Sequence, residues 1–218
     1  MKVFLGVGHG GSDPGAVANN VKEKDLNLSI ALACRDELEK HGVAVKMSRT
    51  KDENDPIGDE VKECNAYGPD FAVDIHNNAG GGDGGEVFYH HGGGKGKTLA
   101  ENILAEMVKV GQNSRGIKTR VNSQGKDYYA FIRNTTCPAV IVECAFVDNA
   151  SDLKILATES QRKSMGEAIA KGILKTLGIE HQSESGHWKV QVGAYLYREN
   201  AEDMQKKIKA VGFDAFIV

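Results

Sequence analysis

Short apolar runs alternate with longer amphipathic segments along most of this 218-residue chain. The runs are rich in β-branched residues, as strands are, and the amphipathic segments repeat their apolar residues with the period of an α-helix. Strands that alternate with helices predict an α/β fold, with a twisted, mostly parallel sheet flanked by helices. The predicted strands span residues 3–7, 43–47, 71–75, 86–90 and 138–142, and the predicted helices span 23–41, 55–67, 98–110 and 158–177.

Two segments show the pattern most clearly. In the 23–41 helix, an apolar residue recurs every fourth position and forms one buried stripe. The run 138–142 (PAVIV) is continuously apolar, which is typical of a strand covered on both faces. Residues 111–130 are polar and predict an irregular surface segment. The glycine-rich stretches 79–85 and 92–94 predict either rims of a groove or simple turns.

Composition excludes several classes of function. The net charge is -3 and no basic cluster stands out, so we expect no nucleic-acid partner and no anionic membrane surface. The four cysteines form no CxxC pair, which argues against a thiolate zinc site and favours reduced core cysteines.

The N-terminus MKVFLGVGHGG has only a short apolar run before its glycines. It is too short for the core of a signal peptide, and no run in the chain reaches the length of a membrane helix. We therefore expect synthesis in the cytoplasm without a signal peptide.

Four polar residues combine into a candidate site. His9, His76 and Glu143 follow or end predicted strands, and Glu23 opens a predicted helix. Ligands collect beyond the carboxyl ends of parallel strands, so these side chains are expected at one edge of the sheet. Two imidazoles and a carboxylate are usual protein ligands of a catalytic zinc, and a second carboxylate can serve as its general base. The set therefore predicts a metal-assisted hydrolase.

Each of the four residues also has a simpler interpretation. His9 alone reads as a surface-loop histidine, Glu23 as a partner of the helix dipole, and His76 as a hydrogen-bonded core histidine. Glu143 is the least easily dismissed, because a buried carboxylate without a partner is costly. Only the combination favours a metal site.

Four segments resemble the type 3 class of zinc-dependent N-acetylmuramoyl-L-alanine amidases, which are bacterial and phage peptidoglycan hydrolases: GHGGSDPGA, EKDLNLSIA, DIHNNAG and VIVECAFVDNASDLKIL. The similarity covers about residues 2–177, in the family's order and spacing. It implies a phosphorylase/hydrolase-like fold, a Zn²⁺ ion bound by His9, Glu23 and His76, and Glu143 as the catalytic residue. It also implies cleavage of the amide bond between N-acetylmuramic acid and L-alanine in peptidoglycan.

One position departs from the family pattern. The family usually has serine, leucine, histidine, alanine and asparagine where this chain has residues 74–78 (DIHNN). Asp74 is either an orienting partner of His76 or simply tolerated, and we favour the second interpretation.

The C-terminal part predicts a second, small unit. Residues 1–178 are assigned to the catalytic domain, 179–187 to a polar linker, and 188–218 to a strand–helix–strand piece. This piece resembles the first half of a SPOR domain, a module that binds glycan strands lacking stem peptides. A half repeat of this size rarely folds alone. We expect either a remnant packed on the catalytic domain or a homodimer in which two chains pair their halves.

Two other functions and two biological settings stay open at this point. The chain is alternatively a non-catalytic wall-binding protein, or a zinc peptidase that cuts bonds within the stem peptide. Without a signal peptide, a wall hydrolase reaches its substrate through a holin, as phage endolysins do, or when a mother cell lyses after sporulation.

Overall fold

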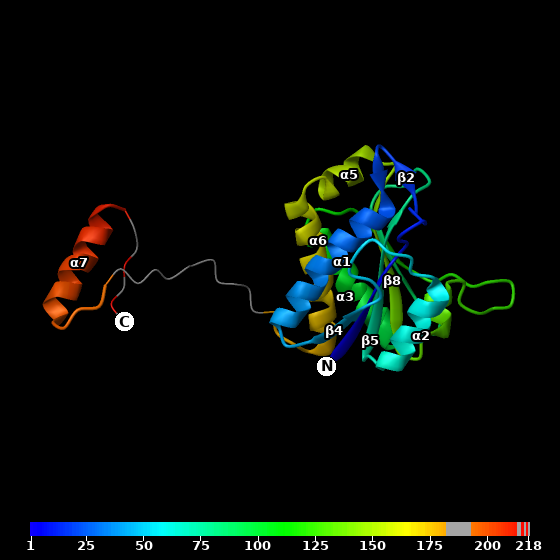
Figure 1. Cartoon of the computed structure of the whole chain (residues 1–218), viewed down its shortest axis with the longest axis horizontal. Helices are drawn as coiled ribbons and strands as arrows, with labels where there is room; N and C mark the ends of the chain where they lie inside the picture. Colours follow the sequence, from blue (N-terminus) through cyan, green and yellow to red (C-terminus); the bar gives the residue numbers. More distant parts are fainter. Residues whose placement is uncertain (182–192, 213–214, 216, 218) are drawn as a thin grey trace. The chain divides into compact units, whose positions relative to one another are not determined.

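A six-stranded sheet in the order β4-β1-β5-β8-β6-β7 forms the centre of the catalytic part (Figure 1). The structure is a computed structural model that describes residues 1–181, 193–212, 215 and 217. It divides into two units, Met1–His181 and Gln182–Val218, and each is described by itself. The strands of the sheet are β1 (Lys2–Val7), β4 (Ala44–Met47), β5 (Phe71–Asn78), β6 (Gly85–Tyr89), β7 (Ser114–Lys118) and β8 (Ala139–Phe146).

The sheet is mostly parallel, as predicted. Strands β4, β1, β5 and β8 pair in parallel, whereas β6 runs antiparallel to β8 and carries β7 on its outer side. The reversal of β6 moves its following turn to the opposite edge of the sheet. The loop 92–94 therefore lies near Pro138, where β8 begins, and does not rim the site where β8 ends.

Helices cover both faces of the sheet. Helices α1 (Glu23–Lys40), α3 (Lys95–Lys109) and α6 (Glu159–Leu177) pack against the face that carries the larger apolar core. Helices α2 (Ile57–Tyr67) and α4 (Ala130–Asn134) pack against a smaller core on the other face. Figure 1 shows α1, α3 and α6 together on one side of the sheet and α2 on the other. The remaining elements are α5 (Ala150–Leu156) and the short pair β2 (Val17–Ala18) and β3 (Val21–Lys22).

Three strands of the six-stranded sheet differ most from the sequence prediction. The segment 111–130 was predicted to be irregular but contains the edge strand β7. Its five residues SRGIK lack an apolar alternation, because none of them is fully buried. Strands β5 and β8 also continue beyond their predicted ends, so His76 and Glu143 lie within strands. The four cysteines are free thiols.

Helices α1 and α6 pack at the distance that a glycine permits. A Cβ atom at Gly166 would lie 2.4 Å from the Ile30 carbonyl oxygen and 2.8 Å from the Cys34 backbone nitrogen. We expect Gly166→Ala to lower the free energy of unfolding by about 1–3 kcal/mol, because the two backbones have to separate. Urea unfolding followed by circular dichroism measures this change.

Gly58 in helix α2 provides the matched control. A Cβ atom there meets nothing within 4 Å. Gly58→Ala is expected to raise stability by about 0.5–1 kcal/mol through helix propensity. Equal effects of the two substitutions would contradict the packing argument.

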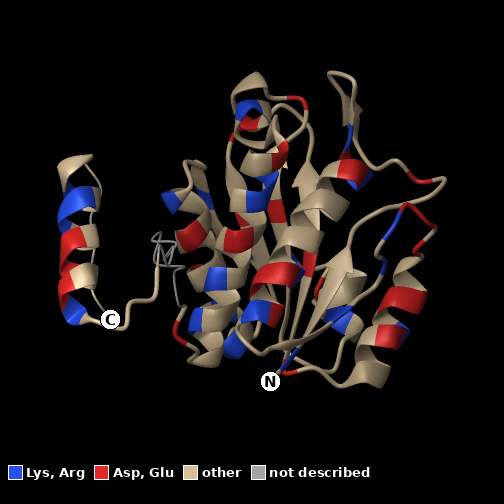
Figure 2. Ribbon diagram, turned by 60° about the vertical axis from the view of Figure 1, so that its left-hand side comes forward, with Lys and Arg blue, Asp and Glu red and all other residues tan. Residues whose placement is uncertain are grey.

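The second unit contains helix α7 (Arg198–Ala210), as the spacing of its apolar residues predicts. The first strand predicted for this unit, over residues 188–192, lies outside the described residues. Of the strand predicted at its end, positions 213, 214, 216 and 218 also lie outside them. Helices in both units carry lysine or arginine interspersed with acidic residues (Figure 2). Among the described residues, no helix is both long enough and apolar enough to cross a membrane.

Candidate metal centre

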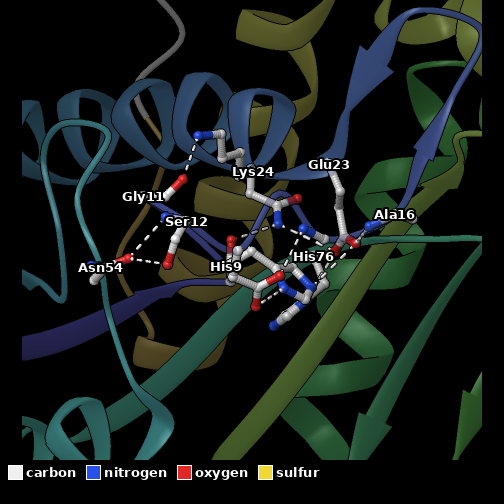
Figure 3. A network of polar contacts seen from close by, with 12 residues as sticks. His9, Gly11, Ser12, Ala16, Glu23, Lys24, Asn54 and His76 are labelled. Carbon is white, nitrogen blue, oxygen red and sulfur yellow. Dashed lines mark hydrogen bonds and ion pairs between the residues drawn. The ribbon is translucent and has the colours of Figure 1, made fainter.

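Three predicted ligands meet at the carboxyl edge of the parallel strands. His9 follows β1 in a left-handed backbone conformation with a φ of 63°, Glu23 is the first residue of α1, and His76 lies in β5. Donor atoms of the three side chains lie within 4.8 Å of one another. Figure 3 shows the three side chains converging from these separate elements. Left-handed non-glycine residues are strained and gather at functional sites, which fits the position of His9.

Each imidazole presents one nitrogen to Glu23 and the other to an aspartate. His9 Nε2 lies 3.2 Å from Glu23 Oε2, and His76 Nδ1 lies 3.0 Å from Glu23 Oε1. On the far side of each ring, His9 Nδ1 contacts Asp13 Oδ2 at 2.8 Å and His76 Nε2 contacts Asp74 Oδ2 at 3.1 Å. A carboxylate only accepts, so each aspartate favours the tautomer whose other nitrogen has a free lone pair toward the centre.

Glu23 is held in place by hydrogen bonds to its carboxylate. Its Oε2 accepts from the Ala16 backbone N–H at 2.9 Å, and its Oε1 accepts from the Asn77 backbone N–H at 3.1 Å. Burial disfavours the charged form, but the hydrogen bonds with His76 and His9 outweigh it and hold the pKa of Glu23 well below its usual range. The Glu23 side chain is therefore an anion in a fixed orientation.

Gly8 allows the His76 ring to lie over the end of β1. A Cβ atom at Gly8 would lie 2.1 Å from His76 Cε1. The close approach explains why a glycine precedes His9, since any larger residue would displace one of the imidazoles.

Glu143 stands beside this cluster on the neighbouring strand. It is paired with His76 in the parallel register of β5 and β8. Within the described part of the chain its Oε2 is buried and has no hydrogen-bond partner. Burial raises the pKa of Glu143 to about 7. A carboxyl group with such a pKa exchanges protons readily near neutral pH, as a general base has to do.

Asp74 contacts the His76 ring, and this contact favours the interpretation of Asp74 as an orienting partner over the one in which it is merely tolerated. Residues two apart on a strand point to the same face, so Asp74 and His76 are neighbours on β5. Two further residues of the site, Asp13 and Asn27, were not predicted; they follow His9 and Glu23, respectively, by four positions. Asn27 Nδ2 donates to Glu23 Oε1 at 3.3 Å. Helical spacing from Glu23 offered a signal for Asn27.

Two other groups bring three potential ligands together, Glu37–His41–His181 and His90–His91–Asp127. Ion pairs and hydrogen bonds account for the contacts between the carboxylate and the imidazoles in both groups. In the described part of the chain, neither group contains a buried side-chain oxygen without a hydrogen-bond partner, whereas the His9 cluster adjoins Glu143 Oε2.

The fold and the site together define a class of protein. It is an α/β protein that carries a His–Glu–His cluster and a buried carboxylate at the carboxyl edge of a mostly parallel sheet. Residues 3–175 match the N-acetylmuramoyl-L-alanine amidase family, and residues 170–218 match the SPOR domain. The chain belongs to the N-acetylmuramoyl-L-alanine amidase family.

Relatives and solved structures agree with this assignment. A sporulation-specific N-acetylmuramoyl-L-alanine amidase of Bacillus subtilis (strain 168) is 36% identical over 222 residues, covering 100% of this chain and 84% of the relative. The endolysin of Bacillus phage SPP1 is 34% identical over 83% of this chain and 68% of its own length. The catalytic domain of CwlV, an N-acetylmuramoyl-L-alanine amidase from Bacillus (Paenibacillus) polymyxa var. colistinus, superposes with a TM-score of 0.74 at 27% identity, covering 82% of this chain and 99% of that structure.

These matches confirm the family resemblance, the fold class and the enzyme class. The chain is a peptidoglycan hydrolase with N-acetylmuramoyl-L-alanine amidase activity. The roles of the individual site residues and the boundary of the C-terminal piece at residue 188 stay predictions.

Proposed function

We propose that this chain cleaves the amide bond between N-acetylmuramic acid and L-alanine, with zinc held by His9, Glu23 and His76 and with Glu143 as general base. The observation that carries the proposal is the juxtaposition of these donors with Glu143. Three donor atoms lie within 4.8 Å, and the buried Glu143 Oε2 beside them has no partner among the described residues.

The donor set fits zinc. Two imidazoles and one carboxylate are the ligand types of catalytic zinc sites, which keep a position for water or substrate. Asp13 and Asp74 bind the outer ring nitrogens, the arrangement by which carboxylates orient zinc-ligating histidines. When bound, zinc supplies a Lewis acid that lowers the pKa of water and polarises the substrate carbonyl.

The chain's own residues then handle the proton. Glu143 accepts a proton from the attacking water and delivers it to the nitrogen of the leaving L-alanine, so that its carboxylate is regenerated. Burial of Glu143 keeps the pKa of its carboxyl group close to neutral pH. Asp13 and Asp74 keep His9 and His76 in one tautomer and one orientation throughout.

Metal removal and fragment analysis test this proposal together. We expect purified protein to contain about one zinc per chain, and a chelator to abolish the release of peptides from peptidoglycan. Mass spectrometry of the digest should find free L-alanine amino termini, which appear only when the muramoyl amide is cut. His76→Ala is expected to lose most of the bound zinc.

Other outcomes select the alternative functions. Fragments with other amino termini would indicate a peptidase, and zinc binding without any released fragment would indicate a wall-binding protein. Full release in the presence of the chelator, with no zinc in the protein, would contradict the metal assignment.

The comparisons favour a sporulation setting over phage lysis. The sporulation-specific relative aligns with the whole chain, including its C-terminal part, whereas the phage endolysin aligns with 83% of it. We infer that the C-terminal piece directs the enzyme to glycan strands of peptidoglycan, which is supported by the SPOR match. Homodimerisation through the half repeat stays a prediction, since one of its strands lies outside the described residues.

A further inference from the structure

A row of polar residues continues from the metal cluster across the sheet. Glu86 of β6 lies directly opposite Glu143 of β8 in the antiparallel register, just as Glu143 pairs with His76 of β5. Side chains alternate along a strand, so Glu86 and Phe88 share the face of Glu143. Lys118 of β7 is paired with Phe88 and lies on the same face. The row therefore reaches the outermost strand.

Glu86 organises two cations at the end of this row. Its Oε2 accepts from Arg115 Nε at 2.7 Å and forms a short contact with Lys118 Nζ, and its Oε1 accepts from Asn78 Nδ2 at 3.1 Å. The Glu86 side chain is only 6% exposed. Burial favours the neutral acid, but Lys118 and Arg115 hold the pKa of Glu86 below its ordinary value. The Glu86 side chain is therefore a carboxylate anion at neutral pH.

The cation pair retains an excess of positive charge and of hydrogen-bond donors. Two cations share one carboxylate, and about a third of each cationic side chain is exposed, 35% for Arg115 and 34% for Lys118. Arg115 Nη1 donates to the Asp83 carbonyl oxygen at 3.4 Å, while Nη2 makes no hydrogen bond to any described residue. The Asp83 side chain accepts a hydrogen bond from Asn113 Nδ2 at 3.0 Å. An incoming anion would therefore find unused donors.

Packing holds the guanidinium in place before any ligand binds. It lies 4.9 Å from the centre of the Phe146 ring, and Phe146 is the last residue of β8. A guanidinium held by an aromatic face and a carboxylate loses little entropy on binding an anion. These contacts also place the loop 79–84 beside the site, since a Cβ atom at Gly82 would meet the Phe146 ring at 2.2 Å.

We propose that Arg115 and Lys118 bind a free carboxylate on the second or third residue of the stem peptide and so make the enzyme selective for acidic stem peptides. This inference rests on the proposed function, because it takes Glu143 as the reaction centre. Strand β7 lies two strand spacings from β8, a distance of about 10 Å. An extended peptide covers this distance with about three residues. The leaving peptide begins at L-alanine, and its next residues reach the cations.

A matched pair of substrates tests the selectivity. Both are muramoyl peptides that begin with L-alanine; one carries free carboxylates at the second and third residues, and the other carries carboxamides there. We expect the kcat/KM of the protein for the acidic substrate to exceed that for the amidated one by about tenfold. The ratio should fall to about 1–2 in Lys118→Gln and Arg115→Gln, and stay near the wild-type ratio in Lys118→Arg.

Lys109→Gln is the control. Lys109 also forms an ion pair with a glutamate, Glu106, but it lies on α3 and belongs to the opposite face of the sheet. The ratio of kcat/KM for the acidic and the amidated substrate should be the same in Lys109→Gln as in the wild type. Thermal unfolding and zinc content of every variant show whether a loss reflects misfolding; should Arg115→Gln not fold, Lys118→Gln and Lys118→Arg still decide.

The possible failures can be told apart. Equal cleavage of both substrates by the wild type, or the same ratio in Lys118→Gln and Lys109→Gln, would overturn the carboxylate site and leave the amidase function intact. Absence of any fragment with a free L-alanine amino terminus, from either substrate and in every variant, would instead refute the proposed function.

Discussion

Replacing Glu143 by glutamine is expected to abolish peptidoglycan cleavage while leaving zinc bound. Glutamine keeps the shape of the side chain but cannot accept the proton of the attacking water, so the rate should fall by about 10²–10⁴-fold. His9, Glu23 and His76 are untouched, and the zinc content should remain at the wild-type value. Release of free L-alanine amino termini, measured beside zinc content, checks both parts.

A glutamate outside the site controls for loss of a carboxylate as such. Glu101 on α3 forms a long ion pair with Lys97 at 3.8 Å, and Glu101→Gln should cleave at the wild-type rate. If Glu143→Gln retained activity within about threefold of the wild type, Glu143 would not be the general base.

In the metal-free protein, Glu143→Gln is also expected to change how the free energy of unfolding depends on pH. The pKa of Glu143 is raised to about 7, so the folded state holds a proton that the unfolded state releases above its ordinary pKa. The folded protein accordingly loses stability as pH rises from about 4.5 to 7, and Glu143→Gln removes this loss. The variant should therefore be more stable than the wild type at pH 8, with a smaller difference at pH 5.

Arg49→Met is expected to lower the free energy of unfolding by about 4 kcal/mol and to weaken zinc binding. Arg49 is 2% exposed and donates to four backbone carbonyl oxygens, those of Val7, Gly8, Lys24 and Lys51, at 2.8–3.3 Å. Methionine fills the volume but supplies none of these four hydrogen bonds. Because the bonds tie the end of β1 to the start of α1, the positions of His9 and Glu23 depend on them. Urea unfolding and zinc titration measure the two effects.

Two variants sharpen this prediction. Arg49→Lys keeps the charge but not the five donors of the guanidinium, so its loss of stability should be intermediate. Arg35 on α1 is mostly bonded to its neighbour Asp36, and Arg35→Met should change stability by less than about 1 kcal/mol. Equal losses for Arg49→Met and Arg35→Met would contradict the proposed role of the buried guanidinium.

Much of the fold follows from local pattern. The run at 138–142 predicted a strand with both faces covered, and β8 lies in the middle of the sheet between helical layers. Strand β7 escaped prediction because it lies at the edge of the sheet, where partial exposure removes the need for an apolar period. The antiparallel direction of β6 also escaped, since a short apolar strand looks the same in either direction.

The candidate site divides in a similar way. His9, Glu23, His76 and Glu143 were predictable because each stands at a recognisable boundary within a recognisable motif. The partners Asp13 and Asn27 were missed, since their roles depend on contacts that their side chains make with His9 and Glu23 in the folded chain. Arg115 and Lys118 lie in a polar stretch without a motif, about thirty residues from the Glu86 that binds them.

The sequence by itself determined the α/β class, the family and the four residues with which the chemistry is proposed to occur. Local periodicity and short motifs carry this information, because they depend on residues close together in the chain. Only the tertiary structure decided that Glu86 stands opposite Glu143 and brings a cation pair into line with it. That arrangement depends on the order, direction and register of strands, which are settled by packing between segments far apart in the sequence.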